Sequence, residues 1–296
     1  MSRILGIGSV TVDQVSVMDG LPEPDRKQEA VQTWHQVGGP VPVALVQAMR
    51  FGHTATFMGK WAADMNGGLI DADFAREGLA LHPACQQARG RTGQASVWVD
   101  VRTASRSIAY TRTDVPPFTP TDLDVLDLAS FDLLHLDGWA GETAVAAAEQ
   151  VQAAGGRVVL DAGSWKPYMD VLFPLVDLVI CSRQFFEPLS GHDDCGLAGS
   201  ALLERGASAL ILTLGQAGCV FMDGSRTLHQ AGFKVEALDT TGAGDVFSGA
   251  VLHALAELMA WPELLRFACA AAAHKCRANG NRDALPSLVD MGSSSG

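Results

Sequence analysis

Residues 239–245 read Asp-Thr-Thr-Gly-Ala-Gly-Asp and lead directly into an apolar run, Val-Phe-Ser-Gly-Ala, at residues 246–250. The two glycines allow backbone N–H groups to converge where a strand is expected to end and a helix to begin, and converging N–H groups make a concave site for an anion. Asp245 stands at the mouth of that site. A carboxylate there would repel a bound phosphate unless it is aimed at the nucleophile that approaches the phosphate. The string therefore predicts a base for phosphoryl transfer.

A plainer interpretation is that Asp245 is a carboxylate favoured at a helix start by the helix dipole, while Gly242 and Gly244 only shape a turn. The full string is more specific than a short glycine motif. It resembles the C-terminal signature of the PfkB, or ribokinase-like, family of small-molecule kinases. The resemblance extends through the following helix to Ala-His-Lys-Cys at residues 273–276. On these residues the chain is identified as a member of that family.

The composition fits a soluble enzyme better than a nucleic-acid-binding protein. The chain has 296 residues, of which 48% are hydrophobic, and a formal net charge of −12. An acidic chain without clustered Lys and Arg is not expected to bind nucleic acid. The N-terminal apolar run is too short for a signal sequence, and no stretch reaches about 18 uninterrupted apolar residues. We therefore expect no membrane segment and a cytoplasmic location.

Short apolar runs typical of strands alternate with amphipathic or alanine-rich helical stretches, which predicts an α/β fold with a mostly parallel sheet covered on both faces. The resemblance implies the ribokinase-like three-layer α/β/α form, as one domain over residues 1–290. The small, polar residues 291–296 are predicted to be a disordered tail. Strands are expected at 4–9, 54–59, 133–136, 157–161, 178–181, 209–213 and 219–222, and helices at 43–50, 67–77, 142–154, 198–205, 245–260 and 262–278.

Two stretches, residues 14–36 and 93–112, break this alternation. Their period-two patterns predict antiparallel strands that are half exposed to solvent. On pattern alone they could be a decoration at a sheet edge. The resemblance implies a discontinuous β lid over the sugar site, which in this family often also pairs subunits. An exposed apolar lid face would favour burial in a homodimer.

The resemblance implies a role for each residue of the glycine string. The amides of Gly242, Ala243, Gly244 and Asp245 would form an anion hole for the migrating phosphoryl group. Asp245 would then deprotonate or orient the acceptor hydroxyl, which also makes it a substrate-binding residue.

The residues expected around the nucleotide come from three segments. The sequence Thr-Leu-Gly-Gln-Ala-Gly at 213–218 matches the family's Thr-x-Gly-x-x-Gly loop beside ATP, although Gly215 and Gly218 could simply form a turn between strands. A Walker A loop, the alternative cradle, is absent. The resemblance assigns nucleotide binding to Ser182, Thr213, Gly215, Gly218, Ala273, Cys276 and Asn279, of which the last three are equally explained as core packing.

Asp239 and Thr241 match positions that in many relatives help bind a monovalent cation behind the anion hole. Carbonyl groups from residues 278–287 complete that site in relatives, and here this second half departs from the family pattern. The expected cofactors are therefore ATP and Mg²⁺, and an additional requirement for potassium is left open.

At the substrate end, Asp13 resembles the family's sugar-binding aspartate, which accepts hydrogen bonds from two hydroxyls. A plain turn residue is the alternative. Gly38 and Gly39 match a glycine pair at which the backbone approaches the ligand closely. Two polar landmarks of the family are missing: Val43 stands where most relatives have Asn, and Ser-Arg-Gln-Phe at 182–185 replaces an Asn-x-x-Glu motif that organises magnesium.

Ser182 together with Lys275-Cys276 resembles the ketohexokinase and sulfofructose-kinase branches of the family. The basic and polar groups expected around a sulfonate are not evident near Ala109 and Gly138, so sulfofructose is not assigned.

The resemblance thus implies ATP-dependent phosphorylation of a hydroxymethyl group on a small sugar or sugar-like acceptor. Two alternatives stay open. A nucleoside kinase of the same family is one, and a non-catalytic protein that binds a sugar or a nucleotide is the other. The side chains of Arg106, Tyr110, Arg112 and Trp139 could shape either kind of pocket.

Overall fold

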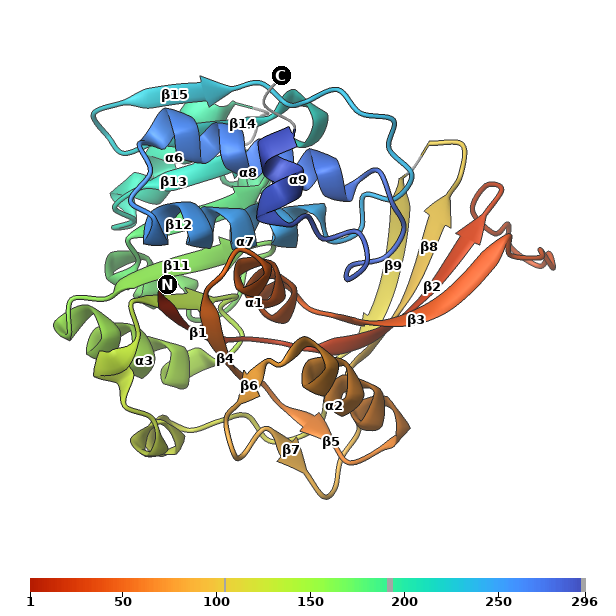
Figure 1. The fold of residues 1–296 in the computed structure, drawn as a ribbon, viewed down its shortest axis with the longest axis horizontal. Helices are drawn as coiled ribbons and strands as arrows, with labels where there is room; N and C mark the ends of the chain where they lie inside the picture. The colour runs from red at the N-terminus through yellow and green to blue at the C-terminus, as the bar shows by residue number, and fades with distance from the viewer. Residues whose placement is uncertain (104, 191–193, 294–296) are drawn as a thin grey trace.

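A nine-stranded sheet runs through the middle of the molecule (Figure 1). The computed structural model describes residues 1–103, 105–190 and 194–293. The strands lie in the order β15-β14-β13-β12-β11-β10-β1-β4-β6, and among the described strands of this sheet only the pairs β13–β14 and β14–β15 are antiparallel. Their bounds are β1 (Arg3–Ile7), β4 (Thr54–Met58), β6 (Ala80–Leu81), β10 (Leu133–Leu136), β11 (Arg157–Ala162), β12 (Leu178–Ser182), β13 (Leu210–Thr213), β14 (Cys219–Met222) and β15 (Thr227–Gln230).

The central strands are apolar and buried along almost their whole length, as in β10 and β12. This is the pattern of a parallel sheet covered on both faces. Helices α1 (Pro40–Arg50), α7 (Ala243–Ala256) and α8 (Trp261–Lys275) pack together in one layer, while α3 (Gly141–Ala153) packs on β10 and β11. The predicted three-layer α/β/α arrangement is confirmed.

The other helices are α2 (Met65–Glu77), α4 (Met169–Leu172), α5 (Arg183–Ser190), α6 (Cys195–Glu204) and α9 (Leu288–Ser293). Short 3-10 helices cover Pro120–Val125, Leu128–Ser130, Phe173–Leu175 and Gly215–Ala217. In the described part of the chain, no helix is both long and apolar enough to cross a membrane.

The strand order reverses at β1, which has β4 on one side and β10 on the other. Crossovers leave this point in opposite directions, so the loops after β1 and β10 separate at the carboxyl edge of the sheet. In open α/β sheets, ligands bind at such a point. Ser9 and Asp137 lie there: the Asp137 Oδ2 atom accepts hydrogen bonds from the Ser9 amide at 2.8 Å and the Ser9 hydroxyl at 2.7 Å.

A second sheet of four strands projects from this edge (Figure 1). Its order is β3-β2-β8-β9, with bounds β2 (Thr11–Met18), β3 (Gln32–Gly38), β8 (Gln94–Asp100) and β9 (Arg106–Thr111). We call it the lid sheet. The expectation of purely antiparallel strands is wrong for its central pair, because β2 and β8 are parallel. Both begin beside the main sheet, where the Val12 amide donates to the Gly93 carbonyl, and both run outward from it.

Several boundaries differ from the predicted ones. Helix α1 begins at Pro40 rather than residue 43, since prolines are tolerated in a first helical turn. Helix α7 begins at Ala243 rather than Asp245. The predicted tail begins too early, because residues 291–293 belong to α9 and Met291 packs into the core. Residues 294–296 lie outside the described part. A further pair of short strands, β5 (Trp61–Ala62) and β7 (Gln86–Gln87), was not predicted.

Candidate functional site

The N-terminus of α7 carries the residues that the sequence predicts to form an anion cradle. Gly242 precedes the helix with φ of 79°, a left-handed conformation that glycine adopts most easily. The Ala243 amide donates to the Thr240 carbonyl at 3.2 Å, and is therefore not free for a ligand. Among the described residues, no acceptor is bonded to the amides of Gly242, Gly244 or Asp245. A Cβ built on Gly244 would meet no atom within 4 Å, so this side of the cradle is open.

Asp245 lies half-buried in the first turn of α7. Burial raises the pKa of Asp245 to about 6, while the charges of Arg106 and Lys275 oppose the rise and that of Asp13 adds to it. Asp13 and Asp245, 232 residues apart in sequence number, therefore share one electrostatic environment. A carboxylate with a pKa near neutrality is suited to accept a proton from a hydroxyl group.

Asp161, at the end of β11, is a site residue that the sequence analysis missed. Its Oδ2 atom accepts a hydrogen bond from the Ser248 hydroxyl at 3.0 Å, one turn after Asp245. Burial, followed by the charge of Asp245, raises the pKa of Asp161 to about 7. The signal that could have found it is its place at the carboxyl end of a parallel strand, where ligand-binding residues gather.

The resemblance implied that Asp239 helps bind a monovalent cation, but in the structure its carboxylate is already paired with a lysine. The Lys275 ammonium lies 2.8 Å from the Asp239 carbonyl and 3.3 Å from its Oδ2 atom, and both side chains are fully buried. The same carboxylate accepts hydrogen bonds from the Thr241 amide at 2.8 Å and the Gly280 amide at 3.1 Å. The carboxylate thus already has a cation and two donors. A monovalent ion beside it would be repelled by the ammonium.

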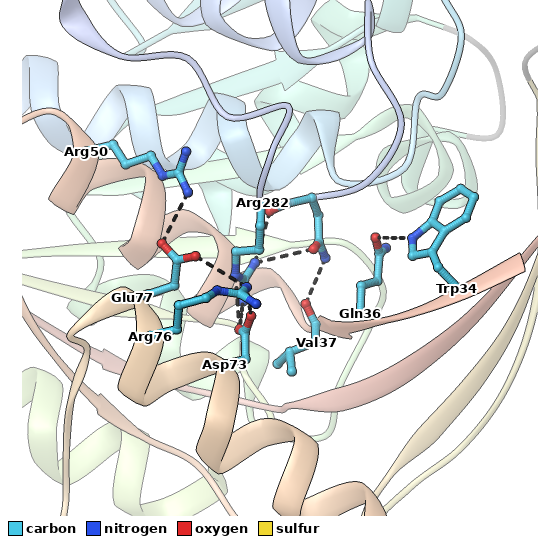
Figure 2. Close-up of polar contacts among 9 residues, drawn as sticks. Trp34, Gln36, Val37, Arg50, Asp73, Arg76, Glu77 and Arg282 are labelled. Atoms are coloured by element: carbon cyan, nitrogen blue, oxygen red, sulfur yellow. Dashed lines mark hydrogen bonds and ion pairs between the residues drawn. The ribbon is translucent and has the colours of Figure 1, made fainter.

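Residues 280–282 tie this region to the N-terminal half of the chain. The Asn281 side chain donates to the Val37 carbonyl at 2.8 Å, directly before Gly38 (Figure 2). Arg282 forms an ion pair with Asp73 of α2 at 2.8 Å, and both side chains are buried. Figure 2 shows Arg282 reaching down to Asp73, which also pairs with Arg76. The segment that follows α8 is therefore anchored at three points, by Gly280, Asn281 and Arg282.

The predicted glycine pair, Gly38 and Gly39, lies directly beside Asp13 and Ser9. A Cβ on Gly38 would overlap the Asp13 carboxylate, and Gly39 has φ of 111°. Asp13 is buried, its pKa is raised by that burial, and it accepts a hydrogen bond from the Thr11 hydroxyl at 2.7 Å. Val43, in the place of the family's Asn, is buried in the hydrophobic core.

Gln36 is a second residue that the sequence analysis missed. It pairs directly with Asp13 across β3 and β2, so the two side chains lie on one face of the lid sheet. Its Oε1 atom accepts a bond from the Trp34 indole at 3.0 Å, but its buried Nε2 atom has no hydrogen-bond partner in the described structure. The amide lies near enough to Asp13 to oppose the rise of the Asp13 pKa. A buried donor of this kind is suited to a polar ligand.

The predicted nucleotide residues lie at the ends of neighbouring elements. Ser182 and Thr213 are paired across β12 and β13, and the Thr213 hydroxyl donates to the Cys181 carbonyl at 3.2 Å. Gly215 and Gly218 both have positive φ, of 62° and 96°. Ala273 lies in the last turns of α8, Cys276 caps that helix, and Asn279 is exposed beyond it. The structure places these residues on separate elements, and in the described part of the chain no hydrogen bond or ion pair joins the first four to the last three.

Basic side chains do gather near Gly138, contrary to what the sequence suggested. A Cβ on Gly138 would lie 3.5 Å from the Lys166 side chain, and the Arg112 guanidinium lies 3.7 Å from the ring centre of Trp139. The expectation failed because Lys166 and Arg112 are distant from Gly138 in the sequence.

The comparisons with known proteins agree with this architecture. The family model described as "pfkB family carbohydrate kinase" matches residues 1–288. Mouse ketohexokinase is 25% identical over 290 residues, covering 94% of this chain and 97% of its own. The ribokinase of Haemophilus influenzae is 25% identical over 289 residues, covering 95% and 94%.

A solved structure of Arabidopsis thaliana ribokinase, complexed with ribose and ATP, superposes with a TM-score of 0.84 at 22% identity, covering 99% of this chain and 98% of that one. At this identity the likeness establishes the ribokinase-like fold. The match of the family model over nearly the whole chain establishes more: the chain belongs to the PfkB family of carbohydrate kinases.

Proposed function

We propose that this protein transfers the γ-phosphoryl group of ATP to a hydroxymethyl group of a small sugar or sugar-like acceptor. The observation that carries the proposal is the position of Asp245. Its carboxylate stands in the first turn of α7 beside the amides of Gly242 and Gly244, which have no acceptor among the described residues, and it shares its electrostatic environment with Asp13. A base, an anion cradle and a hydroxyl-binding carboxylate are the parts that phosphoryl transfer to an alcohol requires.

In the proposed reaction, the acceptor oxygen forms a bond to the γ-phosphorus while the bond from that phosphorus to the leaving oxygen of ADP breaks. The acceptor proton passes to the Asp245 carboxylate. The amides of Gly242, Gly244 and Asp245 would stabilise the charge on the phosphoryl oxygens. The Ala243 amide would support the loop through Thr240 instead of binding the ligand.

Substrate binding would use Asp13 as the acceptor of sugar hydroxyl hydrogens and Gln36 as a donor. Gly38 and Gly39 would leave room for the sugar beside the backbone. The Gln36 amide would supply a polar contact on the sugar side, where the family's Asn is replaced by Val43.

The nucleotide would be ATP with magnesium. Its phosphate side would lie beside Ser182, Thr213, Gly215 and Gly218, and its adenine ring beside Ala273, Cys276 and Asn279. The open side of Gly244 and the free amides beside it fit a phosphate group. Magnesium would neutralise charge on the ATP phosphates as they separate. We do not propose a potassium ion, because the Lys275 ammonium already pairs with the Asp239 carboxylate that would bind the ion.

The test is ADP production from ATP and magnesium with a panel of ketohexoses, pentoses, sugar acids and nucleosides. We expect acceptor-dependent turnover with a sugar or sugar acid. Asp245→Asn should lower kcat by at least about a hundredfold while the protein stays folded. Turnover of Asp245→Asn close to that of the wild type would exclude Asp245 as the base.

We also propose that the lid sheet pairs two copies of the chain. Ile108 and Tyr110 on β9 are 49% and 58% exposed, and large exposed apolar side chains on a lid favour burial against a partner. Light scattering should give the mass of two chains, and Ile108→Lys should shift it to one. A wild-type protein of single-chain mass would exclude this pairing.

A further inference from the structure

Lys166 is an unusual lysine. It lies beyond β11, is only 4% exposed, and its ammonium makes no hydrogen bond or ion pair with any described residue. Lysine is rarely buried to this degree unless it is paired. Burial lowers the pKa of Lys166, the charges of Asp137 and Asp161 oppose that change, and the charge of Arg112 adds to it.

The neighbouring carboxylates are engaged with other groups. Asp137 accepts hydrogen bonds from the Ser9 amide, the Ser9 hydroxyl and the Trp139 amide, and Asp161 accepts one from Ser248. They lie near enough to act on the charge of Lys166 without forming a direct contact. Lys166 is therefore held beside the acidic residues and leaves its own donors unused.

A second cation shares the surroundings of Lys166. The Arg112 guanidinium lies 3.7 Å from the ring centre of Trp139, and the Lys166 ammonium lies 5.5 Å from the same centre. Arg112 comes from the lid sheet, directly after β9, whereas Lys166 lies in the loop that follows β11 of the main sheet. No described carboxylate pairs with Arg112 within 4.0 Å. Two cations that face one aromatic ring without a salt bridge repel each other, and an anion between them would remove that cost.

This pair of cations adjoins the proposed reaction site. Asp161 interacts electrostatically with both Lys166 and Asp245. Tyr110, two residues before Arg112, lies in one cross-strand row with Asp13 through Ala95. The cations therefore flank the acceptor side of the site from the main sheet and from the lid.

We propose that Lys166 and Arg112 bind an anionic group, a carboxylate or a phosphate, carried by the acceptor at the end remote from the hydroxyl group that receives the phosphoryl group. The acceptor is then a sugar acid or a sugar phosphate. This inference rests on the proposed function, since it names the substrate class of the same site. Trp139 would hold the two cations apart and leave their donors free for the anion.

The test compares acceptors that differ in charge but keep a free hydroxymethyl group: sorbitol against gluconate, and fructose against fructose 6-phosphate. We expect the wild type to prefer the anionic member of at least one pair by about tenfold or more in kcat/KM. Lys166→Met and Arg112→Met should each reduce that preference towards one, with a smaller effect on the neutral member. Arg102→Met is the matched control, because Arg102 is a lid arginine already paired with Asp100.

Two outcomes would overturn the inference. One is a wild type that prefers the neutral member of both pairs. The other is a Lys166→Met variant whose kcat falls equally with neutral and anionic acceptors and whose KM for ATP rises. Lys166 would then bind the transferring phosphoryl group of ATP instead of the acceptor. Circular dichroism would verify that each variant is folded.

Binding measurements separate this inference from the proposed function. If no acceptor is turned over, the same four compounds can be titrated calorimetrically into the wild type and both variants. Binding of gluconate or fructose 6-phosphate that is lost in Lys166→Met would support the anion site even though the kinase proposal had failed. Absence of any anion-dependent binding would overturn it.

Discussion

The protonation of Asp245 depends on charges that come from several segments of the chain. Among the charged groups that lower the pKa of Asp245 against the effect of burial, Arg106 has the largest effect. The Arg106 guanidinium lies 3.2 Å from the Thr240 hydroxyl. The base must be ionised to accept a proton, so kcat/KM should fall as the pH drops through about 6, the pKa of Asp245. Arg106→Gln removes a positive charge that favours the carboxylate. We expect the acidic limb of the pH profile to move to higher pH.

The measurement is kcat/KM for the acceptor at saturating ATP between pH 5 and 8. Arg102→Gln serves as the control, because Arg102 also belongs to the lid region but pairs with Asp100 and Asp19. A limb that stays in place in Arg106→Gln, or moves to lower pH, would contradict the assignment of this titration to Asp245.

Gly244 separates the two interpretations of the glycine string. Its φ is ordinary and a Cβ would meet no atom within 4 Å, so Gly244→Ala should fold normally. If the residue only starts a helix, alanine should be harmless or stabilise it by about 0.5–1 kcal/mol. If the open space holds a phosphoryl group, the added methyl group should lower kcat/KM for ATP by about tenfold or more without loss of thermal stability.

Gly242→Ala is the matched comparison for Gly244→Ala. Gly242 has φ of 79°, and a Cβ there would lie 3.4 Å from the Asn281 side chain. The left-handed conformation costs a non-glycine residue about 1–2 kcal/mol, so this variant should lose stability as well as activity. Full activity of Gly244→Ala would favour the plainer interpretation of the motif.

At the scale of elements, α8 supports the loop before α7 through its last residue. The Lys275 ammonium bonds both the carbonyl and the carboxylate of Asp239 in a fully buried position. We expect turnover to be the same in sodium, potassium and choline salts at equal ionic strength, because Lys275 supplies the charge that a monovalent ion would supply. Lys275→Met should destabilise the fold by about 3–5 kcal/mol, since it leaves a buried carboxylate without its cation.

The cation dependence of the variant provides the decisive readout. In Lys275→Met, potassium should raise the melting temperature more than choline does, because a small cation can enter the space beside Asp239. A wild-type enzyme that requires potassium would contradict this account. So would a Lys275→Met variant as stable as the wild type.

The elements predicted well from the sequence are those whose local pattern agrees with their packing. The runs at β10 and β12 are mostly apolar and buried, and they form central parallel strands. The parallel pairing of β2 with β8 could not be predicted, because it depends on where two distant strands leave the main sheet.

The same distinction applies to the candidate site. Gly242 and Asp245 lie in one contiguous motif, so the sequence revealed them. Asp161, Gln36 and Lys166 stand in no motif, and only the folded chain brings them to the carboxyl edge of the sheet. Lys275 was part of the recognised string, but its pairing with Asp239 could not be read from residue spacing.

At the scale of the whole molecule, the chain segment after α8 holds the two halves of the site together. Gly280 bonds Asp239 behind the anion cradle, Asn281 bonds the end of β3 before the glycine pair, and Arg282 pairs with Asp73 of α2. The Arg282 side chain is 6% exposed and burial lowers its pKa, which the charge of Asp73 opposes. The nucleotide side and the sugar side are therefore joined through three consecutive residues.

Arg282→Met should lower the free energy of unfolding by about 3–5 kcal/mol, because it leaves the Asp73 carboxylate buried without its main partner. The double variant Asp73→Leu/Arg282→Met should recover most of that loss, since an apolar pair of similar size needs no compensating charge. Arg205→Met is the control: its pair with Asp170 is exposed and should contribute at most about 1 kcal/mol. Urea unfolding of the four proteins gives these values. If Arg282→Met costs no more than Arg205→Met, the buried pair is not what anchors the segment. If it costs several-fold more and also raises KM for both ATP and the acceptor, the anchoring of residues 280–282 is what keeps the two halves of the site aligned.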